Sequence, residues 1–161
     1  MLDIWSSTWI LSRMPQSVAR VLVHLVFSTK NRQPVIARDT RPALHAYLGG
    51  ILNTLGCSPI RVGGTADHVH ALFSLSRTRT IAEAVEEAKK ASSKWMKQQV
   101  AGDFWWQAGY GAFSIGQSQV AAVSRYIDRQ EEHHRVYSFQ EELRDLLKRY
   151  HVAYDERHVW D

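Results

Sequence analysis

The sequence predicts an α+β fold, in which helices pack on an antiparallel-rich sheet. Two observations carry this prediction. Short segments rich in β-branched residues alternate along the chain with longer segments whose apolar residues recur at helical spacing. Their order is strand, helix, strand, strand, helix, strand, followed by two more helices. This order contains the βαββαβ arrangement of a ferredoxin-like core, and the two C-terminal helices are added to it.

The first half of the chain supplies three predicted strands and one predicted helix. The run ARVLVHLVFST at residues 19–29 is short and ends in the polar KNRQP, so we expect a central strand there. Residues 41–55 place their apolar side chains on one helical face, and a glycine follows as a stop signal. The extended segments 58–63 and 67–75 flank a glycine-containing turn, which predicts a hairpin.

The second half supplies a short strand and the remaining helices. A Thr-x-x-Glu capping box opens an amphipathic segment at 80–99, which we interpret as the second helix. A strand candidate at 112–115 precedes a predicted helix at 118–134. A Ser-x-x-Glu capping box then opens the last predicted helix at 138–150.

Length and composition indicate one folded domain. Of the 161 residues, 45% are hydrophobic and 22% are charged, which argues against disorder and against a membrane protein. We assign residues 18–161 to this domain and residues 1–17 to an N-terminal extension whose order the sequence does not determine.

The formal net charge of +4 would assist phosphate binding without identifying nucleic acid as the partner. The single Cys57 favours a reducing compartment, and no secretory or membrane-spanning segment is apparent, so we expect a cytoplasmic location.

Two histidines lie two positions apart in the segment DHVHALF, at residues 67–73. Side chains alternate between the faces of a strand, so His68 and His70 are predicted to point the same way. Paired imidazoles can bind Mg²⁺, Mn²⁺ or Zn²⁺ when further ligands are present. Such a pair can also be a hydrogen-bonded feature of a core or a surface, and the spacing alone leaves both interpretations open.

A tyrosine and a glutamine lie four positions apart in the predicted helix 118–134. Tyr126 and Gln130 therefore share one helical face, which could hold both side chains over a sheet. Tyr126 could equally be a packed aromatic residue and Gln130 a solvent-facing one. The spacing by itself does not decide between these interpretations.

Taken together, these segments resemble the single-tyrosine transposases of the HUH superfamily, which include insertion-sequence transposases and REP-associated tyrosine transposases. The resemblance extends from about residue 18 to the C-terminus. It is carried by HLVFSTK at 24–30, DHVH at 67–70, SSKW at 92–95, WQAGYGAFS at 106–114 and YIDRQEEHH at 126–134.

The resemblance implies a transposase that cleaves and rejoins single-stranded DNA at hairpin-marked ends through a covalent 5′-phosphotyrosine. It implies that Tyr126 is the nucleophile and that His68, His70 and Gln130 hold a divalent cation, for which we expect Mg²⁺ or Mn²⁺. It also implies a homodimer with composite active sites, in which Tyr126 of one subunit serves the histidine pair of the other. The strand candidate 112–115 is short and carries no charge or proline that guards an edge, so it could pair with its two-fold mate.

Basic residues in two segments are candidate DNA contacts. Lys90 and Lys94 share one face of the second predicted helix, and Lys30 and Arg32 follow the first strand. A solvated helix face and a solvated loop account for them equally well.

Two other functions stay open: a water-using metal-dependent nuclease with the same histidines, and a non-mobile protein that binds hairpin DNA. DNA that stays attached to Tyr126 would distinguish the transposase from the nuclease.

Overall fold

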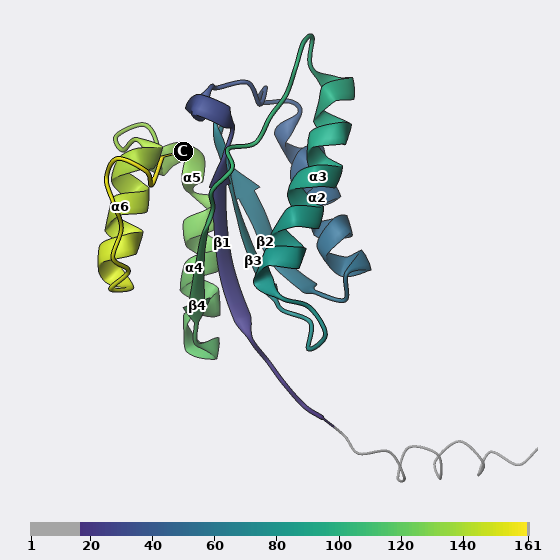
Figure 1. The fold of residues 1–161 in the computed structure, drawn as a ribbon, viewed down its shortest axis with the longest axis vertical. Helices are drawn as coiled ribbons and strands as arrows, with labels where there is room; N and C mark the ends of the chain where they lie inside the picture. The colour runs from purple at the N-terminus through teal and green to yellow at the C-terminus, as the bar shows by residue number, and fades with distance from the viewer. Residues whose placement is uncertain (1–16, 161) are drawn as a thin grey trace, which may run out of the picture.

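The computed structural model describes residues 17–160, so the N-terminal extension lies outside the described residues except for its last position. A four-stranded antiparallel sheet with strand order β2-β3-β1-β4 forms the centre of the fold (Figure 1). The strands are β1 (Leu22–Ser28), β2 (Ser58–Gly64), β3 (His68–Ser74) and β4 (Gly111–Ile115). The predicted α+β class, the central position of the first strand and the hairpin are confirmed.

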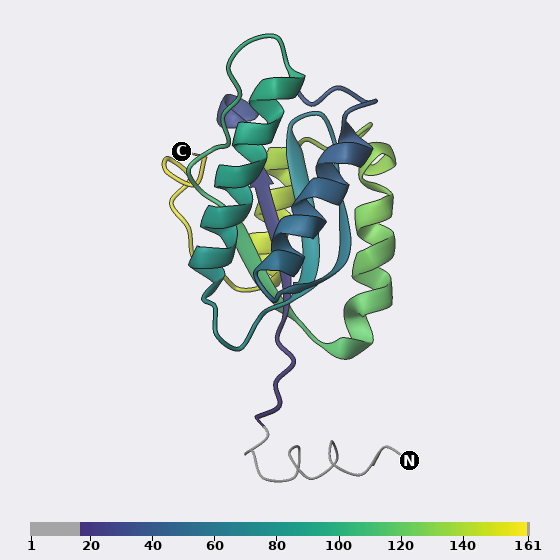
Figure 2. The ribbon, with the colours of Figure 1, turned by 90° about the vertical axis from the view of Figure 1, so that its right-hand side faces the viewer.

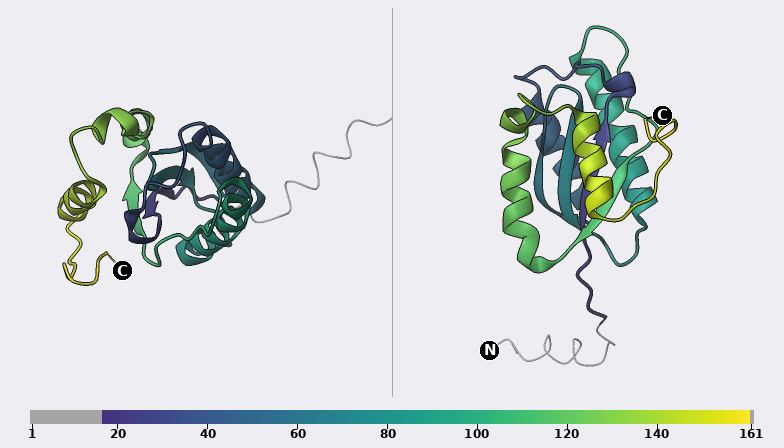
Figure 3. Two further views of the ribbon diagram at one scale, coloured as in Figure 1. Left: turned by 90° about the horizontal axis from the view of Figure 1, so that it is seen from above. Right: turned by 90° about the vertical axis from the view of Figure 1, so that its left-hand side faces the viewer.

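Helices cover both faces of the sheet. In Figures 1 and 2, α2 (Arg41–Thr54) and α3 (Ile81–Gln99) lie together on one face. The opposite face carries α4 (Val120–Asp128) and α6 (Phe139–Arg149), and the two layers are seen on either side of the sheet in Figure 3. Among the helices described, none combines the length and the apolar character that a membrane crossing requires.

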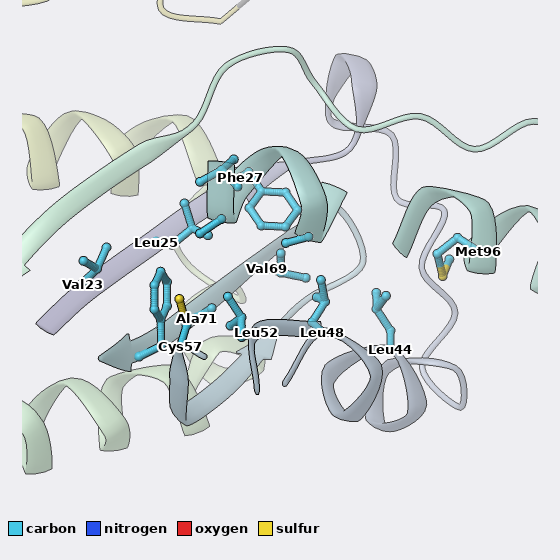
Figure 4. Close-up of a cluster of buried hydrophobic side chains, with 14 of the residues drawn as sticks. Val23, Leu25, Phe27, Leu44, Leu48, Leu52, Cys57, Val69, Ala71 and Met96 are labelled. Carbon is cyan, nitrogen blue, oxygen red and sulfur yellow. The ribbon is translucent and has the colours of Figure 1, made fainter. Parts of the chain in front are cut away.

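The larger core lies between the sheet and the α2/α3 layer (Figure 4). Alternate residues of β1, namely Val23, Leu25 and Phe27, point into it, because side chains alternate across a strand. The residues between them face the α4/α6 layer, where Val26 belongs to a second apolar cluster. The larger core also contains Leu44, Leu48, Leu52, Cys57, Val69, Ala71, Phe73, Val85, Ala88 and Met96.

The local signals at two helix starts are confirmed. Thr80 accepts a hydrogen bond from the backbone N–H of Glu83, and the Glu83 carboxylate accepts one from the backbone N–H of Thr80. Ser138 and Glu141 make the same reciprocal pair at the start of α6. Each pair satisfies backbone donors that the first turn of a helix would otherwise leave free.

The predicted helix 118–134 is not continuous. It consists of a 3₁₀ turn, η2 (Gln117–Gln119), then α4, and then a single turn, α5 (Gln130–His133). Arg129 separates α4 from α5 with φ −97° and ψ 15°, which lies outside the α-helical region. No glycine or proline marks this break in the sequence. Helical hydrogen bonds are present on either side of the break: the backbone N–H of Arg129 donates to the carbonyl oxygen of Arg125 at 3.1 Å, and the backbone N–H of His133 donates to that of Arg129 at 2.9 Å.

Candidate active site

Three histidines from the two central strands lie on the sheet face that α4 and α6 cover. His68 and His70 come from β3, and their side chains share this face as the alternation of the strand predicts. His24 comes from the neighbouring β1 and stacks on His70 with 5.1 Å between the ring centroids. All three residues are buried. The two middle strands of the sheet thus form the floor of a polar site.

Each imidazole of the His68/His70 pair is oriented by a partner on its Nδ1 atom. Asp67 Oδ1 lies 2.6 Å from Nδ1 of His68, and His24 Nε2 lies 2.9 Å from Nδ1 of His70. With Nδ1 occupied, the Nε2 atoms of both rings are directed toward the α4/α6 layer. Metal-binding histidines commonly have such a partner on the second nitrogen, which fixes the orientation of the ring.

Tyr126 and Gln130 lie over the histidines from the opposite layer. Gln130 is 1% exposed, and its Oε1 atom lies 2.9 Å from His68 Nε2. The Tyr126 ring meets the His70 ring edge-on, with 5.8 Å between the centroids. Gln130 is therefore not a solvent-facing residue. The structure brings together, within one chain, all four side chains expected at the catalytic centre.

A glycine in β2 allows α4 to approach the sheet this closely. A Cβ atom on Gly63 would lie 2.7 Å from Cγ2 of Ile127 and 2.9 Å from its carbonyl oxygen. Gly63 is paired with His70 across the sheet, and Ile127 directly follows Tyr126 in the chain. The missing side chain at position 63 therefore sets how close the tyrosine lies to the histidines.

Replacing Gly63 with alanine should displace α4, because the added methyl group would overlap both the side chain and the backbone of Ile127. We expect DNA cleavage to fall by at least about tenfold while the circular dichroism spectrum of the protein is retained, since a small misplacement of a reacting group has a large kinetic effect. Gly50→Ala is the matched control, because a Cβ at Gly50 meets no atom within 4 Å. Unchanged cleavage by Gly63→Ala would contradict this positioning role.

Glu142, from α6, lies at the centre of the site and was not predicted from the sequence. Its side chain is 2% exposed. The Oε2 atom of Glu142 lies 2.8 Å from His134 Nε2 and 3.4 Å from the Nε2 atoms of both His68 and His70. One buried carboxylate oxygen is therefore surrounded by three imidazoles.

The other carboxylate oxygen of Glu142 faces the α4 and α5 residues. It accepts a hydrogen bond from the Tyr126 hydroxyl and another, of 2.8 Å, from Nε2 of Gln130. Gln130 thus bridges the two layers, because its oxygen faces His68 and its nitrogen faces Glu142. The carboxylate connects the tyrosine to the histidine pair.

A signal for Glu142 is present in the pattern of α6. The buried positions of this helix follow the i, i+3, i+4, i+7, i+8 spacing of a face that packs on a core. Glu142 occupies one of these positions, and an unpaired carboxylate is expensive to bury. An acidic residue in an apolar stripe therefore indicates a functional side chain. The buried residues of α6 are Phe139, Glu142, Leu143, Leu146 and Leu147.

The charges in the site are coupled. Burial alone would lower the pKa of His68, but its hydrogen bond to Asp67 and the neighbouring Glu142 outweigh this effect and raise the pKa to about 9. Burial raises the pKa of the Glu142 carboxyl, but hydrogen bonding and charge from the surrounding histidines, His134 first, hold it well below its usual range. The pKa of Tyr126 is raised, first by burial and then by the negative charge of Glu142. The resting phenol is therefore protonated near neutral pH.

The donor set fits a divalent cation. Nε2 of His70 is buried and has no hydrogen-bond partner among the described residues, although it points into the site. His68, His70 and Glu142 each offer a ligand atom, and these atoms lie within 4.8 Å of one another. His133, His134 and Glu142 form a second such group around the same carboxylate. Imidazole nitrogens mixed with carboxylate and amide oxygens suit Mn²⁺ and, with more oxygen ligands, Mg²⁺.

The four basic residues expected to contact DNA lie in two places. Lys90 and Lys94 are exposed on α3, in the layer on the far side of the sheet from the histidine pair. Lys30 and Arg32 lie in η1 (Lys30–Arg32), directly after β1. The Arg32 guanidinium lies 5.9 Å from the centroid of the Trp160 ring. The structure does not bring these residues together with the catalytic side chains.

Arginines that sequence reasoning did not single out lie next to Tyr126. Arg125 and Arg129, together with His133, line a surface hollow that reaches Tyr126. Arg125 directly precedes Tyr126 in α4, and Arg129 is the residue between α4 and α5. Their guanidinium groups place positive charge in the surface hollow next to the Tyr126 side chain.

The sheet is ferredoxin-like and carries a buried histidine pair, and a tyrosine and a glutamine lie above that pair. These features place the chain in the class of single-tyrosine HUH proteins. Residues 17–130, more than half of the chain, match the family model described as "Transposase IS200 like". The chain belongs to this IS200-like transposase family.

Two solved structures show the same fold. One is a candidate transposase from Deinococcus radiodurans R1, which is 22% identical, with a TM-score of 0.59 over 73% of this chain and 96% of that one. The other is a REP-associated tyrosine transposase bound to a REP hairpin, which is 12% identical, with a TM-score of 0.57 over 76% of this chain and 73% of that one. None of the curated proteins matches the chain.

Proposed function

We propose that this transposase cleaves and rejoins single-stranded DNA at hairpin-marked ends through a covalent 5′-phosphotyrosine at Tyr126. The observation that supports this proposal most directly is the convergence of Tyr126 with His68 and His70 on one enclosed space. The family supports a transposase with DNA nuclease activity. The REP hairpin bound by the second solved structure supports a hairpin substrate.

His68, His70 and Gln130 are proposed to hold Mg²⁺ or Mn²⁺. When bound, the cation would polarise the scissile phosphate and stabilise charge on the leaving 3′ oxygen. Asp67 and His24 would keep the two imidazoles oriented toward it.

Tyr126 is proposed to supply the attacking oxygen. Its phenol, which is oriented by its hydrogen bond to Glu142, loses its proton as the new O–P bond forms, while the bond from phosphorus to the 3′ oxygen breaks and that oxygen takes up a proton to become a free 3′-OH, so that no net proton is gained or lost. The phosphotyrosine keeps the energy of the phosphodiester bond, so a second 3′-OH can reverse the step and join a different DNA end.

Lys30, Arg32, Lys90 and Lys94 are proposed to contact DNA outside the catalytic centre, because all are basic and three of them are exposed. Since α3 lies across the sheet from Tyr126, the single strand that extends from a hairpin bound there would have to run around the domain to reach the catalytic face.

A homodimer is proposed to form through β4, which pairs with β1 on one side and with no other strand in residues 17–160.

Replacing His68 or His70 with alanine should eliminate cleavage and lower the affinity for Mn²⁺, because each variant removes one metal ligand. Binding of hairpin DNA should be largely preserved, since phosphate contacts supply most of its affinity. Gln130→Ala should have a milder effect. Isothermal titration with Mn²⁺ and gel shifts with hairpin DNA measure the two properties separately.

His158→Ala is a matched control, because this histidine is exposed and pairs with Asp155 away from the site. Unchanged Mn²⁺ affinity in both histidine variants would rule out the proposed metal site. Loss of hairpin binding together with cleavage would show that the histidines support the DNA surface rather than the cation.

A further inference from the structure

We propose that Glu142 is a direct ligand of the divalent cation, so that His68, His70 and Glu142 form a two-histidine, one-carboxylate metal site. The proposal rests on the metal site of the proposed function and adds a charged ligand to it. It assigns to α6, which follows the part of the chain matched by the family model, a side chain of the catalytic centre.

The separations between the candidate ligand atoms are close to those of a loaded site. Glu142 Oε2 lies 3.4 Å from Nε2 of His68 and 3.4 Å from Nε2 of His70. Neighbouring ligands of an octahedral ion lie roughly 3 Å apart when each metal–ligand distance is about 2.1 Å. Both separations from Glu142 are thus close to that spacing, and the ligand atoms of all three residues lie within 4.8 Å of one another, so one ion could contact all three after small side-chain movements.

Two features of the site call for a cation at this position. Nε2 of His70 is buried, directed at Glu142 Oε2, and without a hydrogen-bond partner in residues 17–160. Glu142 is buried as well, and its ion pairs in the described part of the chain are all with histidines rather than with lysine or arginine. A carboxylate removed from water is costly unless positive charge compensates it, and a divalent cation supplies more of that charge than a single imidazolium. A bound divalent ion would satisfy both the orphan nitrogen and the carboxylate.

The two oxygens of Glu142 have separate partners, and this division suits a ligand. Oε2 faces the histidine pair, whereas Oε1 accepts hydrogen bonds from Tyr126 and from Nε2 of Gln130. A carboxylate that binds a metal through one oxygen can still accept hydrogen bonds at the other. Glu142 would thus hold the Tyr126 hydroxyl next to the metal site, and Gln130 would hold the carboxylate in place.

The consequence of a carboxylate ligand is that the protein binds the cation before DNA arrives. An all-neutral set of two imidazoles and one amide leaves the charge of the ion to be balanced by the DNA phosphate. A carboxylate supplies one negative charge from the protein itself, and hard divalent cations favour charged oxygen ligands.

The test is Mn²⁺ binding to the metal-free, full-length protein without DNA, by isothermal titration at neutral pH. We expect Glu142→Gln, which keeps the size of the side chain but removes its charge, to lower the Mn²⁺ affinity by at least about tenfold. Glu132→Gln is the matched control, because this exposed glutamate lies close to the tyrosine in the same surface hollow as His133, and it should bind Mn²⁺ as the unmodified protein does. His68→Ala should lose affinity in parallel with Glu142→Gln.

A spectroscopic measurement separates coordination from an indirect effect on folding. With ¹³C-labelled glutamate carboxyl groups, electron–nuclear double resonance of the bound Mn²⁺ should show a ¹³C coupling in the unmodified protein and in Glu132→Gln, and none in Glu142→Gln. Circular dichroism should be unchanged in all three proteins.

Three outcomes would overturn the assignment: unchanged Mn²⁺ affinity in Glu142→Gln, absence of the ¹³C coupling in the unmodified protein, or absence of Mn²⁺ binding before DNA is added. If His68→Ala still loses Mn²⁺ while Glu142→Gln does not, the metal site of the proposed function survives without Glu142. If DNA cleavage requires Mn²⁺ although the free protein binds none, the proposed function survives and the carboxylate ligand does not.

Discussion

Replacing Tyr126 with phenylalanine should abolish the covalent complex between the protein and DNA. The change removes one oxygen atom and leaves the ring, which packs edge-on against His70 and His24. The fold should therefore be retained, and the loss should come from the missing nucleophile. Single-stranded hairpin DNA with a label on the 3′ side of the cleavage site, incubated with Mg²⁺ or Mn²⁺, should transfer the label to the unmodified protein in denaturing gels.

A matched control is Tyr47→Phe, which makes the same atomic change on α2, in the other helical layer. It should form the adduct at the normal level. An undiminished adduct in Tyr126→Phe would exclude Tyr126 as the nucleophile. Cleavage without any protein-linked product would support the water-using nuclease, and hairpin binding without cleavage would support the non-mobile DNA-binding protein.

The stability of Tyr126→Phe gives a second readout. The Tyr126 hydroxyl donates to the buried carboxylate of Glu142, so its removal takes one hydrogen bond from that carboxylate. His134 and Gln130 still donate to it, which limits the loss. We expect a decrease of about 1–3 kcal/mol in the free energy of unfolding, measured by denaturant titration. A protein that remains folded and binds hairpin DNA shows that the lost adduct reflects chemistry.

The sequence was sufficient to predict those parts of the fold that depend on local patterns. Capping boxes at Thr80 and Ser138 and alternation within the strands are properties of neighbouring residues, and the structure has them where expected. Alternation is also what placed His68 and His70 on one face. The break at Arg129 was not predicted, because neither glycine nor proline signals it in the sequence.

The composition of the site depended on long-range packing. Glu142 reaches the histidines only because α6 folds back onto the sheet through Phe139 and its apolar neighbours, which pack with Val26 and Phe113. The spacing along the chain carries no information about that contact. For the same reason the sequence did not reveal that α3, which carries Lys90, lies in the layer on the far side of the sheet, since the face of a sheet that a helix covers is decided by the topology.

In a homodimer, the tyrosine of each active site comes either from the same chain as the histidine pair or from the other chain. Within one chain, Tyr126 already lies against His70 and Glu142, so a complete site does not need a second subunit. The homodimer with composite sites stays a prediction. In such a dimer, α4 would leave its own sheet and make the same contacts with Gly63 and Leu72 on the partner's sheet. Those contacts would be exchanged rather than lost, so the two arrangements differ little in buried area.

The segment between β4 and α4 would have to redirect the helix in a composite dimer. Gly116 is extended there, and a Cβ atom at this position would make only ordinary contacts with Gln119 and Ser118. The backbone N–H of Gly116 donates to the side chain of Gln119, a local contact that either arrangement can keep. The connection therefore imposes no strong preference for the chain on which α4 lies.

Mixing inactive variants distinguishes the two arrangements. In a composite dimer, Tyr126→Phe and His68→Ala chains should restore about a quarter of the normal number of sites after random subunit exchange, because half of the dimers are mixed and each mixed dimer has one intact site. In a within-chain arrangement the same mixture should stay inactive. The reciprocal control mixes unmodified protein with the double variant Tyr126→Phe/His68→Ala. Each mixed dimer then keeps one intact site if the site is built within a chain and has none if it is composite. No recovery after demonstrated subunit exchange would refute the composite site, and a monomer by light scattering at the working concentration would refute the dimer.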